Sequence, residues 1–378
     1  MYALSDDQTA LIDAVRGFAD AAIAPFANEW DRTRHFPVDV LAQAGELGLG
    51  GIYTREQWGG AGLSRTDTAL VFETLARADT ALAAYISIHN MVTWMIDAFG
   101  DDAQRERWLP GLTSMTRLGS YCLTEPGAGS DAAALTTRAA RDGDEYVIDG
   151  VKQFISGAGT SSVYIVMART GEPGPRGVSA IVVPDGTPGL SFGPLEHKMG
   201  WSLQPTRQVI LDGVRVPVTH RLGEEGAGFG IAMKGLNGGR LNVAACSLGG
   251  AQWALDRTIA YMGERTTFGK RLSEHEALLF RLSDMATQLR AARGLLREAA
   301  EALDSDDPGV VPLCAMAKQF VTDVAFTVAN DALQLHGGYG YLSEYGIERV
   351  VRDLRAHQIL EGTNEIMRLI VGRSLVAA

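Results

Sequence analysis

The spacing of apolar residues changes twice along this chain, and these changes constrain its fold more than any other feature. Apolar side chains first recur every three or four residues, which is the period of an amphipathic helix. They then gather in short β-rich runs between turns, and finally return to the helical period. The order helical, β, helical predicts three domains, at residues 1–119, 120–228 and 229–378.

Each region has segments that carry its pattern. The first contains the helical series Leu11, Val15, Phe18 and Ala22, and a segment at 80–99 that is apolar on more than one side, which implies burial. The β-rich runs lie at 146–148, 163–166, 178–183 and 208–211. They predict a compact antiparallel β domain. The last region has two helical stripes, which indicate a helical bundle: Leu278, Leu282, Met285 and Leu289, then Met316, Phe320, Val324 and Val328.

Charge and cysteine content exclude several kinds of function. The net charge is −11 and no lysine or arginine run occurs, which argues against nucleic-acid binding. No apolar stretch approaches the roughly 20 residues that cross a bilayer, and the acidic N-terminus is unlike a signal or transit peptide. The three cysteines, Cys122, Cys246 and Cys314, are isolated. We therefore expect buried, reduced thiols in a cytoplasmic protein without a metal site.

A lone carboxylate, Glu361, stands among apolar residues near the C-terminus and is followed at once by Gly362. Apolar surroundings raise the pKa of a carboxylate, as a base that removes a proton from carbon requires. The glycine lets another molecule press against the backbone. The alternative is a surface glutamate at a helix start, because Glu-Gly-Thr-Asn is also ordinary capping composition.

A glycine-rich segment, 121–131, opens the β domain with the sequence Tyr-Cys-Leu-Thr-Glu-Pro-Gly-Ala-Gly-Ser-Asp. Its glycines expose backbone N–H groups, and Thr124 and Ser130 add hydroxyl donors, which would suit a ring carbonyl or a phosphate. It lacks the strand–helix context of a nicotinamide-binding G-x-G-x-x-G motif. A polar turn without a ligand is the alternative.

Three further motifs allow two interpretations each. Arg265 beside the glycine-containing turn 266–270 could clamp a pyrophosphate, or belong to a solvated charge cluster. Residues 237–240, Asn-Gly-Gly-Arg, pose the choice between nucleotide contacts and a helix start. His336 has no serine or aspartate partner at an informative spacing, so we expect a hydrogen-bonded structural histidine.

Together, in this order and spacing, these segments resemble the acyl-CoA dehydrogenase family over essentially the whole chain. Four blocks carry the likeness: Tyr121 to Ser130, Gly239-Arg240 with Ala244 and Ala245, Arg265 to Lys270, and Gln334 to Gly338 followed by Glu361-Gly362-Thr363. Segments 84–91, 154–159, 236–240 and 359–364 look like the branch that acts on isobutyryl-CoA. The resemblance implies an α+β multidomain fold with an N-terminal α-helical domain, a middle antiparallel β-barrel and a C-terminal four-helix bundle.

The resemblance also implies FAD and a homotetramer. By resemblance, the ring of FAD would be held by Tyr121, Leu123, Thr124, Gly129, Ser130, Phe154, Ile155 and Ser156, with Thr363 and Glu365 nearby. The adenosine diphosphate half would be held by Arg265 with Phe268, and by Gln334, Leu335, Gly337 and Gly338 of a neighbouring subunit. The CoA ester would meet Ser130, Asn237, Arg240, Gly362 and Arg373.

This sequence departs from the family pattern at two positions. Phe154 stands where the family often has tryptophan, which keeps an apolar wall and loses an indole N–H. Glu276 stands where glutamine is usual, and an anion near a pyrophosphate is unfavourable, so Glu276 is not among the expected cofactor residues. Some relatives place the base just before the arginine that matches Arg240; here that residue is Gly239, which leaves Glu361 as the matching candidate.

The implied reaction is α,β-dehydrogenation of an acyl-CoA thioester. Glu361 would take the α-proton as the β-hydride leaves to flavin N5, and the Glu361 N–H with a flavin ribityl hydroxyl would form an oxyanion hole. The branch-level likeness favours isobutyryl-CoA, oxidised to methacrylyl-CoA in valine degradation, with an electron-transfer flavoprotein as acceptor. One methylene changes discrimination by only about 1–3 kcal/mol, so 2-methylbutyryl-CoA and butyryl-CoA are alternatives. The aromatic residues Tyr85 and Trp94 could shorten the acyl pocket or pack between domains.

Two other functions compete with the dehydrogenase. A flavin oxidase on the same scaffold would hand electrons to oxygen and form peroxide rapidly. A non-enzymatic flavin- or CoA-binding assembly protein would show no bleaching of the flavin band with any acyl-CoA. The intact Glu361 argues against the second of these.

Overall fold

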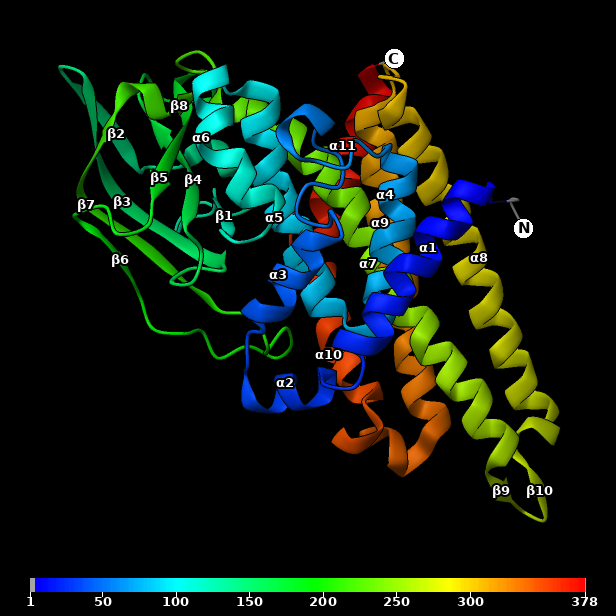
Figure 1. Ribbon diagram of the computed structural model, residues 1–378. Coiled ribbons are helices and arrows are strands. Elements are labelled where there is room, and N and C mark those ends of the chain that lie inside the picture. Colours follow the sequence, from blue (N-terminus) through cyan, green and yellow to red (C-terminus); the bar gives the residue numbers. More distant parts are fainter. Residues whose placement is uncertain (1–3, 378) are drawn as a thin grey trace.

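The N-terminal region is helical, as the sequence predicts. The computed structural model describes residues 4–377, and Figure 1 shows a β domain at one end of the molecule with helices over the rest. The first six helices are α1 (Asp6–Phe18), α2 (Ala27–Thr33), α3 (Val38–Glu46), α4 (Arg65–Ala78), α5 (Thr80–Phe99) and α6 (Asp102–Thr113). Asp79 accepts a hydrogen bond from the N–H of Leu82 and so caps α5, most of whose residues are buried. The sequence signal at 80–99 is therefore confirmed.

The middle region is one eight-stranded sheet in the order β6-β7-β3-β2-β4-β5-β8, with β1 also paired to β4. The strands are β1 (Gly119–Cys122), β2 (Arg138–Asp142), β3 (Glu145–Ser156), β4 (Val163–Arg169), β5 (Val178–Pro184), β6 (Leu190–Phe192), β7 (Thr206–Pro217) and β8 (Arg221–Leu222). Most pairs are antiparallel, but β4 runs parallel to both β1 and β2. The sheet is therefore mixed rather than wholly antiparallel, because the chain between β1 and β4 returns to the same end of the sheet.

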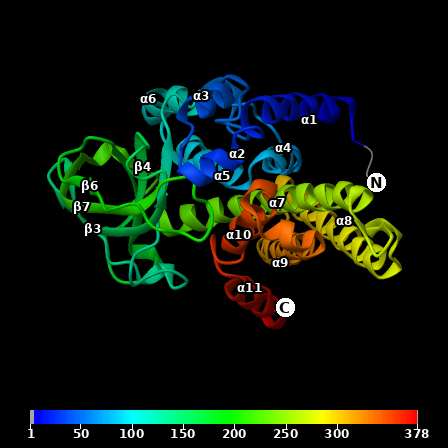
Figure 2. The ribbon, with the colours of Figure 1, turned by 90° about the horizontal axis from the view of Figure 1, so that it is seen from below.

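The C-terminal region is built on a helix of 37 residues, α7 (Gly228–Glu264). Around it lie α8 (Glu276–Asp304), α9 (Val310–His336), α10 (Ile347–His357) and α11 (Asn364–Ala377). Between α7 and α8 a short hairpin, β9 (Thr266–Thr267) and β10 (Lys270–Arg271), projects from the molecule (Figure 1). Seen from below, α7 runs from beside the sheet into the helical bundle (Figure 2). It thus links the β domain to the far end of the bundle.

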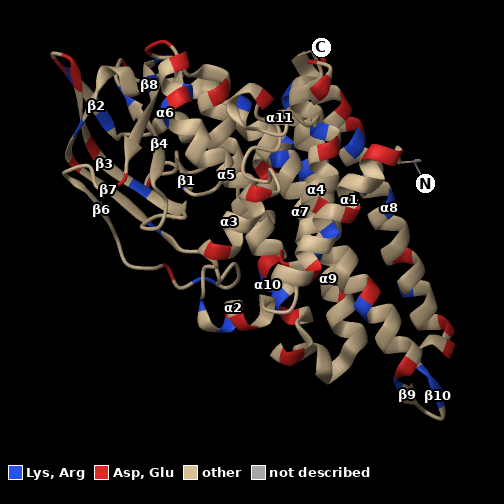
Figure 3. Ribbon diagram, in the orientation of Figure 1, with Lys and Arg blue, Asp and Glu red and all other residues tan. Residues whose placement is uncertain are grey.

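The segment Val310–Tyr341 of the described chain is long and apolar enough to cross a membrane by length and composition alone. The expectation that no such stretch exists was therefore wrong. The segment contains α9, and residues on this helix, such as Val321, Val328 and the charged Lys318, are fully or almost fully buried within the protein. Its apolar character is consistent with a central bundle helix. Figure 3 shows acidic and basic residues spread over the elements rather than gathered in a patch of one sign.

Candidate active site

Two regions of the chain meet at Glu361, which lies in the turn between α10 and α11. Its backbone is left-handed, with φ of 55°, and that of Gly362 is also positive at 93°. This conformation turns the carboxylate towards α7. A Cβ atom added to Gly239 on α7 would lie 2.3 Å from Glu361 Oε2. Glycine at 239 therefore leaves the space that the carboxylate occupies.

The Glu361 carboxylate is poorly solvated. The residue as a whole is half-buried, yet its Oε2 is buried and has no hydrogen-bond partner within residues 4–377. Burial raises the pKa of Glu361 to about 7, and the positive charges of Arg240 and Lys318 oppose the shift. A carboxyl group with this pKa changes charge near neutral pH, which suits a general base. The sequence expectation of apolar surroundings is consistent with this geometry.

Two cations hold the turn that carries Glu361. Lys318 of α9 is buried, and its Nζ donates to the carbonyl of Gly362 at 2.8 Å and to Asn364 Oδ1 at 2.9 Å. Arg240 of α7 donates through Nη1 to Asn237 Oδ1 at 2.8 Å and through Nε to the carbonyl of Glu361 at 3.4 Å. Both cations thus contact backbone rather than the carboxylate itself. Sequence analysis missed Lys318, because a lysine within an apolar helical run carries no motif.

Two more polar groups without partners belong to residues around this site. The hydroxyl of Tyr121 is buried and unbonded, and burial together with the Glu361 charge raises its pKa. Arg65 Nη1 is also buried and unbonded, and it would lie 2.8 Å from a Cβ atom at Gly238, the neighbour of Gly239. The Arg65 guanidinium stacks 3.5 Å from the ring centre of Tyr53. Arg65 and Tyr53 were not foreseen, because nothing in the sequence links positions so far from α7 to this site.

The glycine-rich segment after β1 is fixed by a buried ion pair. Lys152 of β3 donates to Glu125 at 2.8 Å, and Glu125 also accepts the N–H groups of Thr136 and Thr137. Burial alone would raise the pKa of Glu125, but Lys152 and these donors outweigh it and lower the pKa to about 2. The segment 121–130 is therefore rigidly attached to β3. Gly129 and Ser130 at its far end stay exposed.

Phe154 lies near the end of β3 beside this segment. Its φ is 59° and its residue is 63% exposed, although the next residue, Ile155, is buried. The N–H of Gln153 donates to the carbonyl of Thr124 at 2.8 Å, and the hydroxyl of Ser120 donates to the carbonyl of Ser156 at 2.6 Å. Residues 121–130 and 154–156 thus form one surface, with an exposed aromatic ring on it.

The other expected cofactor residues lie elsewhere. Arg265, Gln334, Leu335, Gly337 and Gly338 line a groove of about 500 Å³ between the C-terminal end of α9 and the β9–β10 hairpin. Phe268 at the tip of the hairpin is 98% exposed. This groove lies beside the projecting hairpin, whereas β1, which leads into 121–130, lies well away from it where the sheet meets the helices (Figure 1). One copy of the chain therefore does not bring the two groups of residues together.

The remaining expected residues lie near the last two helices or in the bundle. Thr363 and Glu365 are at the start of α11, where Thr363 Oγ1 accepts the N–H of Ile366 at 3.4 Å. Arg373 is exposed on α11 and forms no hydrogen bond or ion pair with Glu361. His336 is structural as expected: its Nδ1 contacts the carbonyl of Ala332 at 2.8 Å and its ring stacks on Tyr261. All three cysteines are buried and free, and the described residues contain no metal-ligand cluster.

A poorly solvated carboxyl group with a pKa near 7 that faces a glycine has the features of a general base in an enzyme. Comparison with known proteins identifies the family. The N-terminal, middle and C-terminal domain descriptions of acyl-CoA dehydrogenases match residues 5–116, 120–214 and 226–376. The chain therefore belongs to the acyl-CoA dehydrogenase family and is an FAD-dependent oxidoreductase acting on CH–CH groups.

Three similar proteins illustrate the match. The mitochondrial isobutyryl-CoA dehydrogenase of Bos taurus is 52% identical over 99% of this chain and 90% of its own length. The structure of butyryl-CoA dehydrogenase from Megasphaera elsdenii is 37% identical with a TM-score of 0.96, and covers both chains completely. A structure from a study of the electron transferring flavoprotein of Acidaminococcus fermentans is 38% identical with a TM-score of 0.97, again over both chains.

The residues present fit FAD. A flat, largely apolar ring needs an aromatic wall and a few polar donors beside the base. The exposed ring of Phe154 and the unbonded hydroxyl of Tyr121 supply these features. The groove lined by Arg265 and the backbone of 337–338 offers a guanidinium and glycine N–H groups, which suit a pyrophosphate.

Proposed function

We propose that the enzyme oxidises isobutyryl-CoA to methacrylyl-CoA in valine degradation, with Glu361 as the base. The observation that carries the role of Glu361 is the buried, unbonded Oε2 facing Gly239. The similarity to the bovine isobutyryl-CoA dehydrogenase supports the substrate. Butyryl-CoA and 2-methylbutyryl-CoA are the nearest alternatives, because a pocket discriminates weakly between them.

In the proposed mechanism, Glu361 Oε2 takes the α-proton of the thioester. FAD, when bound, supplies the acceptor for the hydride that leaves the β-carbon. The N–H of Glu361 has no acceptor within residues 4–377, so it is free to donate to the thioester oxygen as that oxygen becomes negative. One such donor is typically worth about 3–4 kcal/mol of transition-state stabilisation. Glu361 would thus supply both the base and a donor for the developing charge.

The two aromatic residues of α5 differ in their suitability as pocket walls. Tyr85 is fully buried, and its hydroxyl contacts the carbonyl of Gly119 and the hydroxyl of Ser161, so it packs between the helices and the sheet. Trp94 is half-buried and lies 5.6 Å from the Arg65 guanidinium. We infer that Trp94, together with Arg65 and Tyr53, rather than Tyr85, limits the acyl chain.

We infer a homotetramer in which FAD is shared between copies. The separation of the two groups of expected cofactor residues supports this arrangement, because a neighbouring copy could bring its groove to the surface at 121–130. By this proposal the ring contacts are Tyr121, Leu123, Thr124, Gly129, Ser130, Phe154, Ile155, Ser156, Thr363 and Glu365. The substrate contacts are Ser130, Asn237, Arg240, Gly362 and Arg373. The exposed Phe268 would then become buried against another copy.

The proposed electron acceptor is an electron-transfer flavoprotein, as the study of the similar Acidaminococcus fermentans structure suggests. We also propose the domain boundaries 1–119, 120–228 and 229–378, and a cytoplasmic location. The bovine relative is mitochondrial, and fractionation of cells that produce this enzyme tests the proposed location.

Replacing Glu361 by glutamine tests the central proposal. Glu361→Gln should keep FAD and bind isobutyryl-CoA, but its flavin band should not bleach on anaerobic addition of substrate. An active variant would place the base elsewhere. Turnover of wild-type enzyme with a dye acceptor and each C4 and C5 ester tests the substrate separately, and a higher kcat/KM for butyryl-CoA than for isobutyryl-CoA would contradict that assignment.

A further inference from the structure

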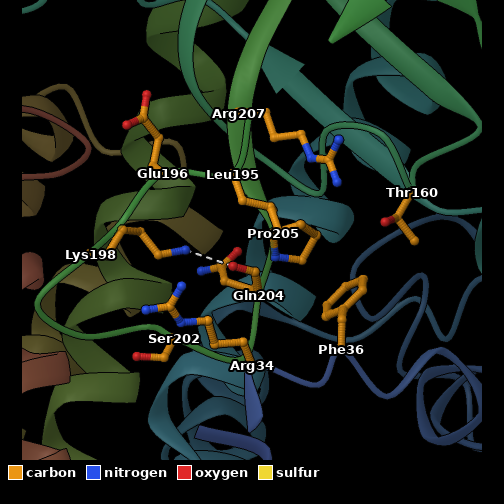
Figure 4. Close-up of a pocket in the computed structure, with 10 residues that line it drawn as sticks. All are labelled: Arg34, Phe36, Thr160, Leu195, Glu196, Lys198, Ser202, Gln204, Pro205 and Arg207. Carbon is orange, nitrogen blue, oxygen red and sulfur yellow. Dashed lines mark hydrogen bonds between the residues drawn. The ribbon is translucent and has the colours of Figure 1, made fainter. Parts of the chain in front are cut away.

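A small cavity outside the active site lies between the end of α2, the connection 193–205 and strand β7. Its volume is about 100 Å³, and its walls include Arg34, Lys198, Arg207, Gln204 and Thr160. Arg34 and Lys198 lie on one side of the opening, and Arg207 with Thr160 on the other (Figure 4). The cavity thus joins three basic side chains from distant parts of the sequence.

None of these three cations forms an ion pair with an acidic side chain in the part of the chain that the structure describes. Arg34 contacts only the ring of His197, at 3.1 Å. Arg207 Nε is buried without a partner. Lys198 donates to the carbonyl of Gln204 and to Thr206 Oγ1, and burial lowers its pKa to about 8, with the charge of Asp353 opposing and that of Arg34 assisting. Three cations that lie together without an ion pair favour an anionic ligand.

Glu196 on the cavity wall favours the charged form of Lys198, but it forms no ion pair with any of the three cations within residues 4–377. Glu196 accepts a hydrogen bond from Gln153 Nε2 at 2.7 Å, which directs its Oε1 towards β3. Even if Glu196 lowered the local charge by one, two positive charges would still face the cavity.

Gln204 is the second, independent sign of a ligand. The residue is 1% exposed, and neither its amide nitrogen nor its amide oxygen has a hydrogen-bond partner among residues 4–377. Leaving one such buried group unsatisfied costs about 1–3 kcal/mol. A ligand that fills this need must both accept a hydrogen bond and donate one.

We propose that this cavity binds inorganic phosphate. Monohydrogen phosphate carries two negative charges for the three cations, acceptor oxygens for the amide N–H of Gln204, and one O–H that can donate to the amide oxygen. Sulfate has the same shape and charge but no O–H, and acetate is a planar monoanion. A cavity of about 100 Å³ has room for one such ion.

A bound phosphate ion would connect segments of the chain that lie beside the helical bundle containing Glu361. The connection 193–205 is already tied to α10, because the N–H of Trp201 donates to Asp353 and Arg352 donates to the carbonyl of Met199. Phosphate would add ties from this connection to Arg34 and to β7. Binding should therefore stabilise the folded protein without changing the chemistry at Glu361.

Calorimetry on the FAD-loaded enzyme tests the proposal with inorganic phosphate as the probe, at constant ionic strength. One phosphate should bind per chain, and sulfate should bind about tenfold more weakly, which corresponds to about 1.4 kcal/mol. Glycerol phosphate should bind weakly or not at all; binding equal to that of phosphate would identify a phosphate ester as the ligand and overturn the assignment. Acetate should not bind.

Two variants complete the test. Arg207→Gln should weaken phosphate binding about tenfold or more, whereas Arg215→Gln, which changes an exposed arginine of the same strand, should not. Gln204→Leu should remove the preference for phosphate over sulfate while the protein stays folded. Absence of binding heat, unchanged binding in Arg207→Gln, or an acidic side chain of a second copy seated in the cavity in a crystal would each overturn the proposal.

Discussion

Gly239 and Glu361 face each other so closely that a methyl group on Gly239 would lie 2.3 Å from the Glu361 carboxylate oxygen Oε2. The two residues are far apart in sequence, and neither α7 nor the turn before α11 forms this contact alone. The position of the carboxylate is therefore set by the absence of a side chain on the facing helix.

The first prediction concerns this contact. Gly239→Ala should displace the carboxylate and lower kcat for acyl-CoA oxidation by at least about tenfold, with FAD still bound. Gly230→Ala is the matched control, because a Cβ atom at Gly230 of the same helix would meet open space. The control should keep activity and gain about 0.5–1 kcal/mol of stability. Normal turnover by Gly239→Ala would show that the carboxylate is free to move.

The second prediction concerns pH. Because the pKa of Glu361 is raised from 4.5 to about 7, kcat/KM should fall as the pH drops through about 7 and the base becomes protonated. The stability of the folded protein should have the opposite dependence on pH. The folded protein holds this proton between pH 4.5 and 7 while the unfolded chain releases it, so stability falls as the pH rises through that window.

Glu361→Gln should remove this pH dependence. Relative to the wild type, the free energy of unfolding of the variant should increase by at most about 3 kcal/mol between pH 4 and pH 8. Urea unfolding of both proteins at the two pH values measures the difference. A constant difference would mean that the carboxylate is solvated in the folded protein.

The third prediction concerns Lys318. Lys318→Met should leave the carbonyl of Gly362 and Asn364 Oδ1 without their donor and cost about 1–3 kcal/mol. It should also remove a charge that lowers the pKa of Glu361, so the acidic limb of the kcat/KM profile should move to higher pH. Lys234→Met, which changes an exposed lysine on α7, is the control. An unmoved acidic limb would limit Lys318 to a structural role.

The fourth prediction concerns the buried pair Lys152 and Glu125. Lys152→Met should leave a buried carboxylate unpaired and cost about 3–5 kcal/mol. The pKa of Glu125 is lowered to about 2, so its contribution to stability is present above about pH 4.5 and is lost as the pH falls through 2. The variant lacks the cation that lowers this pKa, so the stability lost by Lys152→Met should be largest near pH 7 and should shrink as the pH falls towards 2. Urea unfolding of both proteins across this range measures the difference, and a difference that stays constant with pH would contradict the pairing.

The order of domains followed from the sequence because helical and strand periods differ, and 80–99 was recognised because an apolar helix of that length must be buried. The mixed sheet was not foreseen, because the parallel pairing of β1 with β4 depends on where a long connection returns. The surroundings of Glu361 show the same limit. The sequence showed that Gly239 cannot act as the base. Its contact with the Glu361 carboxylate depends on how α7 packs against a distant turn, which the sequence pattern does not reveal.

Residues that act through contacts rather than motifs were the ones missed. Lys318 and Arg65 are single charged residues whose meaning comes from what they touch, and Gln204 is an ordinary polar residue until its burial is known. Phe268 shows a further limit, since its near-complete exposure becomes informative only under the proposal that another copy of the chain covers it.

The left-handed backbone at Glu361 lowers the stability of the folded protein at the residue that we propose as the catalytic base. A residue other than glycine in this conformation costs roughly 1–2 kcal/mol, in addition to the expense of an unsolvated carboxylate. A mutant library selected only for resistance to heating should therefore be enriched in glycine at position 361. Under the proposal that Glu361 is the base, those more stable variants would have no dehydrogenase activity.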